Sequence, residues 1–103
     1  MLEDIGCEKM KTHDALVREV ASRLNGGTID TFVEYKQGEM DIVRYNLFGD
    51  IETIYEIKTQ GHLGRAAEQL YRAKDYFEYQ QITPINTVYV SQHKDGSLKV
   101  RRI

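Results

Sequence analysis

Two amphipathic segments enclose a run of strand-like sequence, and this alternation limits the fold more than any other feature of the chain. Residues 12–24 carry leucine and valine at a spacing of four, which predicts a helix with one apolar face. Residues 63–80 have apolar side chains at the same helical spacing, so we expect a second amphipathic helix there. Residues 28–35, between the helices, alternate and are rich in β-forming residues, which indicates a strand.

The other expected strands form two pairs. Residues 40–45 and 51–58 predict a hairpin joined by a loop at residues 47–50. Residues 85–91 and 97–103 predict a second pair after the second helix. The expected order is α-β-β-β-α-β-β, a mixed sheet flanked by helices, in the α+β or α/β class.

The length of 103 residues suits one compact domain and is too short for two. We therefore expect residues 1–103 to form a single domain, into which any function must be built. The single cysteine, Cys7, has no internal disulfide partner. The chain has no apolar run long enough for a transmembrane helix and no secretory signal pattern at Met1–Asp4, so we expect a cytoplasmic (intracellular) protein without membrane partners.

The hairpin places three charged side chains on one patch. With residues 47–50 as a four-residue loop, the expected opposed pairs are Asn46 with Ile51, Tyr45 with Glu52, Val43 with Ile54, and Asp41 with Glu56. Opposed residues of an antiparallel pair project to the same face, with Cα atoms ~4.5–5.5 Å apart. Lys58 follows Glu56 by two positions and so shares its face.

Two carboxylates side by side destabilise a sheet unless something compensates their charge. A divalent cation is a natural compensation, because Mg²⁺ favours one or two carboxylates together with water and phosphate oxygens. The patch of Asp41, Glu56 and Lys58 therefore predicts a metal site that acts on phosphate. One alternative is that these are solvated charges on an exposed sheet face. Another is a one-residue slip, which would place Asp41 opposite Tyr55 and separate the carboxylates.

The same residues carry a family resemblance. Gly38-Glu39-Met40-Asp41, followed by Tyr55-Glu56-Ile57-Lys58, resembles the PD-(D/E)XK nuclease superfamily, which includes restriction endonucleases, archaeal Holliday junction resolvases and repair nucleases. The resemblance covers about residues 12–91 and implies a restriction endonuclease-like core. It also implies that Asp41 and Glu56 bind a metal and that Lys58 is the catalytic lysine. Met40 stands where the superfamily name has proline, and the 36–39 turn lacks the longer serine-bearing loop usual in resolvases.

Further site residues follow from the resemblance. It implies that the backbone carbonyl of Ile57 and a glutamate of the first helix, Glu19, join the metal ligands. Glu19 alternatively forms a surface ion pair with Arg23. The resemblance also implies a functional glutamine in the second helix, which Gln69 matches.

Gln69 belongs to a polar stripe on the second expected helix, together with Arg65 and Arg72 by helical spacing. This stripe predicts contacts to backbone phosphates, and its alternative is an ordinary solvated helix face. The three histidines lack metal-ligand spacing and are expected at the surface, with His62 close enough to the catalytic strand to contact substrate.

The formal net charge of −2 is unusual for a nucleic-acid-binding protein. The charge is uneven, however, because residues 94–103 hold four basic side chains against Asp95 alone, which permits a local basic surface.

We expect a Mg²⁺- or Mn²⁺-dependent hydrolase that cleaves DNA phosphodiester bonds, with a Holliday junction resolvase-like, repair or restriction-like enzyme all open. We also expect a homodimer through Leu63 to Phe77 or through the final strand. The alternatives are a catalytically silent nucleic-acid-binding or scaffold module of the same fold and an unrelated α+β interaction domain.

Overall fold

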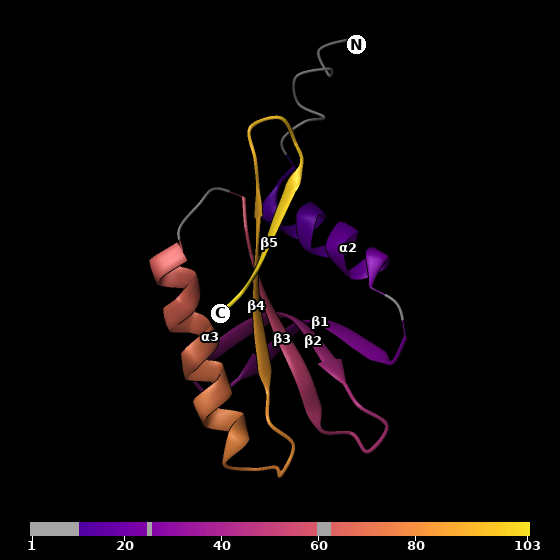
Figure 1. The fold of residues 1–103 in the computed structure, drawn as a ribbon, viewed down its shortest axis with the longest axis vertical. Helices are drawn as coiled ribbons and strands as arrows, with labels where there is room; N and C mark the ends of the chain where they lie inside the picture. The colour runs from indigo at the N-terminus through magenta and orange to yellow at the C-terminus, as the bar shows by residue number, and fades with distance from the viewer. Residues whose placement is uncertain (1–10, 25, 60–62) are drawn as a thin grey trace.

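A computed structural model describes residues 11–24, 26–59 and 63–103 of the chain (Figure 1). These residues form a five-stranded mixed sheet and two helices in an α+β fold. The sheet order is β1-β2-β3-β4-β5, in which β3 and β4 are parallel and the other neighbours are antiparallel. The bounds are α2 His13–Arg23, β1 Thr28–Tyr35, β2 Gly38–Tyr45, β3 Ile51–Lys58, α3 Leu63–Glu78, β4 Asn86–Gln92 and β5 Leu98–Arg102. The expected order of elements is confirmed.

Most of the element boundaries follow local sequence signals. Thr12 caps α2, because its side-chain oxygen accepts a hydrogen bond from the Ala15 N–H at 3.3 Å. Strand β2 begins at Gly38, two residues earlier than expected, so the preceding turn is shorter than predicted. Helix α3 ends at Glu78 rather than at residue 80. Neither helix within the described ranges is both long enough and apolar enough to cross a membrane.

The two helices lie on opposite sides of the sheet (Figure 1), and each covers its own apolar core. The α3 core contains Leu70 together with Met40 and Val43 of β2. The α2 core contains Leu16 and Ile42. The crossover from β3 to the parallel strand β4 runs through α3, and this connection fixes α3 against one face of the sheet.

Leu70 supplies a test of the α3 core. Its side chain is fully buried, whereas the neighbouring Tyr71 is half exposed. We expect Leu70→Ala to lower the free energy of unfolding by ~2–5 kcal/mol, because it removes buried methyl groups and leaves a cavity. Tyr71→Ala is the matched control and should cost much less. Urea unfolding of both variants measures the difference, and equal losses would contradict this packing of α3.

Candidate metal and phosphate site

The site lies where β2 and β3 stop pairing. The ladder between them includes Val43 with Ile54 and ends at Ile42 with Tyr55. Beyond that last pair, the Ile57 N–H donates a hydrogen bond of 2.8 Å to Oδ2 of Asp41. A side chain therefore takes the ladder position that a backbone carbonyl would otherwise hold, and the carboxylate lies in the gap between the strands.

The predicted register is right near the site and wrong near the loop. Val43 faces Ile54 as expected. The pairs Tyr45 with Glu52 and Asn46 with Ile51 are wrong, because a shift after Arg44 pairs Tyr45 with Ile51. Oδ1 of Asn46 accepts hydrogen bonds from the N–H groups of Phe48 and Asp50 at 2.8 and 3.1 Å. This side-chain turn tightens the hairpin and absorbs one residue as a bulge.

The backbone changes its alternation at Asp41. Met40 and Val43 pack in the α3 core, whereas Ile42 packs in the α2 core, so strict alternation fails at this point. On the neighbouring strand, Phe32 has a φ of 53°, a left-handed conformation that a bulky side chain rarely adopts. The β1–β2 pairs Thr31 with Ile42 and Val33 with Met40 lie on either side of Phe32 and Asp41. Such local strain often accompanies functional sites in proteins.

The two carboxylates are buried. Asp41 is 4% exposed and Glu56 is 5% exposed, so the alternative of solvated charges on an open face is wrong for both. Nζ of Lys58 lies 3.5 Å from Oε2 of Glu56, and Lys58 itself is partly buried. Lys58 thus contacts Glu56, and Asp41 reaches the same strand through the N–H of Ile57, the residue between them. The expected opposed pair of Asp41 with Glu56 is not part of the ladder.

This arrangement makes the charged form of Glu56 unfavourable. Burial is the largest cause, the nearby Asp41 carboxylate is the second, and together they raise the pKa of Glu56 from 4.5 to about 7. Lys58 and His13 oppose the shift without cancelling it. A divalent cation would relieve this repulsion.

His13 is a site residue that the sequence analysis missed. It was expected at the surface, but its Nε2 lies 3.2 Å from Oδ2 of Asp41 and its side chain is partly buried. Burial lowers the pKa of His13, but the charge and hydrogen bond of Asp41, with a smaller effect of Asp14, raise it above 6.5 overall. The only sequence signal was its place directly after the capping Thr12.

Glu19 points to other partners. Its carboxylate pairs with Nζ of Lys11 at 3.2 Å and with the guanidinium of Arg23. The expected ion pair with Arg23 is therefore present, and His13 rather than Glu19 is the α2 residue in contact with Asp41.

The expected stripe residues of α3 differ in exposure, since Arg65 and Arg72 are exposed and Gln69 is partly buried. Oε1 of Gln69 is buried without a hydrogen-bond partner in the described part of the chain. Burial raises the pKa of Tyr35, the charge of Arg72 lowers it and the charge of Glu56 raises it. Arg65 is exposed in the first turn of α3. His62 and Cys7 lie outside the described residues.

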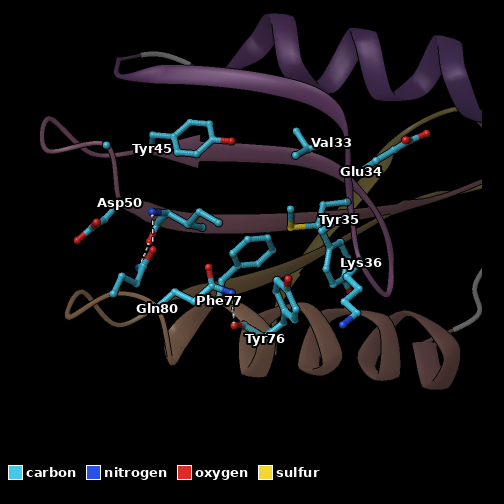
Figure 2. Close-up of a pocket in the computed structure, with 13 residues that line it drawn as sticks. Val33, Glu34, Tyr35, Lys36, Tyr45, Asp50, Tyr76, Phe77 and Gln80 are labelled. Carbon is cyan, nitrogen blue, oxygen red and sulfur yellow. Dashed lines mark hydrogen bonds between the residues drawn. The ribbon is translucent and has the colours of Figure 1, made fainter.

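A hollow of about 440 Å³ lies between the sheet and the C-terminal half of α3 (Figure 2). Tyr35, Tyr76 and Phe77 form its aromatic wall, with ring centroids 4.9 to 5.4 Å apart. Met40, the neighbour of Asp41, also lines it. The hollow therefore adjoins the carboxylate pair without containing it.

The donor set fits a hard divalent cation. Asp41 and Glu56 are both buried, and the Asp41 carboxylate is one cause of the raised pKa of Glu56. Among the described residues, no group of three or more His, Cys, Asp or Glu side chains is suited to hold a metal. A cation here would therefore rely on two carboxylates with backbone and water oxygens, a set that Mg²⁺ accepts.

A scan against models of known protein families gives no match to the chain, and searches of curated proteins and of solved structures give none either.

Proposed function

We propose that this protein is a metal-dependent nuclease that hydrolyses DNA phosphodiester bonds. The observation that carries the proposal is that Asp41 and Glu56 are both buried on adjoining strands, with Asp41 bonded to the Ile57 N–H next to Glu56 and Lys58 at 3.5 Å from Glu56. Such a costly group of charges is typical of functional sites. The order of elements and the placement of the acidic residue and the E-X-K motif on β2 and β3 also support a restriction endonuclease-like core.

Asp41, Glu56 and the backbone carbonyl of Ile57 would hold Mg²⁺ or Mn²⁺. When bound, the cation would stabilise negative charge on the phosphate and favour deprotonation of a water molecule. Glu19 is the remaining candidate ligand, after exchange of its partners Lys11 and Arg23.

The chain's own residues supply the other functions. Lys58 places an ammonium group where charge builds on a phosphate oxygen. His13 is a positioning residue, because its contact at 3.2 Å and the Ile57 N–H at 2.8 Å both hold Oδ2 of Asp41. Arg72 and Gln69 of α3 would bind the DNA backbone, with Arg65 at the helix start.

A structure-specific endonuclease, such as a Holliday junction resolvase-like enzyme, is the narrower proposal. Cleavage of both strands of a junction needs two sites, which a homodimer supplies. Half-exposed Tyr71 on α3 and exposed Val100 on β5 are apolar surface residues on the two expected interfaces.

The test is cleavage of supercoiled plasmid and of a four-way DNA junction with Mn²⁺, with Mg²⁺ and with EDTA. We expect nicked or resolved products with either metal and none with EDTA. Glu52→Gln, which removes a carboxylate from the same strand outside the site, should retain cleavage, and Glu56→Gln should lose it. Products in EDTA, or equal cleavage by Glu56→Gln, would exclude this mechanism.

A further inference from the structure

The sheet register extends the site toward its edge. Lys58 of β3 lies beside Ser91 of the parallel strand β4, and Ser91 pairs with Lys99 of β5. Paired neighbours project to the same face of a sheet, so Lys58 and Lys99 share one face.

A parallel row lies next to the first. Glu56 neighbours Tyr89, and Tyr89 pairs with Arg101. Tyr89 packs in the α3 core, which identifies the face as the α3 side of the sheet. The basic residues Lys99 and Arg101 therefore lie on the same side as Glu56 and Lys58.

The β4 and β5 members of these two rows line a groove of about 260 Å³. Its walls include Ser91, His93, Lys99 and Arg101, and no carboxylate is found among its described lining residues. The nearby Asp95 is engaged by Ser97, whose N–H and hydroxyl donate to Oδ1 at 2.9 and 2.7 Å. The groove therefore offers cationic groups and a hydroxyl in a concave surface, which suits a phosphate.

We propose that Lys99 and Arg101 bind backbone phosphates of the DNA strand whose scissile phosphate lies at Lys58. The proposal rests on the proposed function and extends it to the substrate path. Two strand spacings of ~4.8 Å separate Lys58 from Lys99. At ~3.4 Å of helix axis per nucleotide of one strand, this distance corresponds to about three nucleotides. A nucleic-acid backbone is favoured over an acidic peptide because the groove continues the row that begins at the phosphate-binding lysine.

Strand β5 provides its own control. Arg102 is adjacent to Arg101 and equally basic, but it pairs with Val88, which packs on the α2 side. Arg101 and Arg102 are both exposed, so their replacement removes the same charge from opposite faces without opening the core. Lys94, in the β4–β5 turn, is combined with Arg102 as the control, so that each double variant removes one lysine and one arginine.

The experiment measures DNA affinity by fluorescence anisotropy as a function of salt, with a labelled four-way junction in EDTA. Each lost phosphate contact lowers the slope of log K against log salt by ~0.9. We expect the double variant Lys99→Ala/Arg101→Ala to lose about 1.8 of the slope and at least tenfold in affinity. Lys94→Ala/Arg102→Ala should lose less than about a third of that slope change, and the charge-conserving variant Lys99→Arg/Arg101→Lys should keep the wild-type slope.

The outcomes separate this inference from the proposed function. Equal slope losses in the two double variants would overturn the assigned face, and an unchanged slope in the first would overturn the phosphate contacts. Wild-type protein that binds with the expected slopes but fails to cleave in Mn²⁺ would contradict the nuclease proposal and leave the groove supported. If the wild type cleaves in Mn²⁺ but the Lys99→Ala/Arg101→Ala variant keeps the wild-type slope, the nuclease proposal is supported and the phosphate contacts of the groove are contradicted.

Discussion

Replacing Lys58 with methionine is expected to reduce the rate of DNA cleavage by a factor on the order of 10²–10³. Methionine keeps most of the length of the side chain and removes the ammonium group that lies 3.5 Å from Glu56. The loss should fall on kcat, because stabilisation of charge that develops in the transition state contributes little to ground-state binding. Single-turnover cleavage of the four-way junction measures this rate.

Metal binding distinguishes Lys58 from the carboxylates. Lys58→Met should retain Mn²⁺ binding by calorimetry, because a lysine is not a metal ligand. Asp41→Asn should lose both cleavage and Mn²⁺ binding. Lys74→Met, which removes a lysine paired with Glu78 on α3, is the matched control and should cleave normally. A Lys58→Met variant that cleaves at the wild-type rate would remove this residue from the mechanism.

The fold was predictable because its signals are local. Helical spacing identified α2 and α3, and alternation identified the strands, with boundaries that differ from the structure by one or two residues in most elements. The hairpin register near the loop was not predictable from spacing alone. Four hydrogen bonds that involve Asn46 and the backbone of Phe48, Gly49 and Asp50 shape the loop, and a bulge follows.

The site was predictable only in part. Asp41, Glu56 and Lys58 lie on two strands whose register could be estimated, and alternation puts Glu56 and Lys58 on one face. The break in alternation at Asp41 was not visible in the sequence. His13 contacts Asp41, which lies 28 positions later in the sequence, and that contact depends on how α2 packs on the sheet. No periodicity reports such a contact. The basic end of the chain was visible in the sequence, but only the β4–β5 register separates Arg101 from Arg102.

The metal-free protein is expected to lose stability as the pH rises from about 4.5 to about 7. Burial and Asp41 raise the pKa of Glu56 from 4.5 to about 7, so between these values the folded protein keeps a proton that the unfolded chain has released. Stability therefore falls with rising pH in that window, by about 3 kcal/mol at ~1.4 kcal/mol per pH unit. The raised pKa of His13 acts in the same direction, because its contribution is complete below 6.5 and is lost as the pH passes its folded value.

Glu56→Gln should remove most of this loss, because the amide is neutral at every pH in the window. At pH 8 in EDTA we expect the variant to unfold at higher urea than the wild type, whereas at pH 4 the two should be nearly equal. Addition of Mn²⁺ at pH 8 should stabilise the wild type and not the variant, since only a protein that binds the ion gains from it. A wild type that is more stable than Glu56→Gln at pH 8 without metal would mean that Glu56 is a structural group rather than a ligand awaiting its cation.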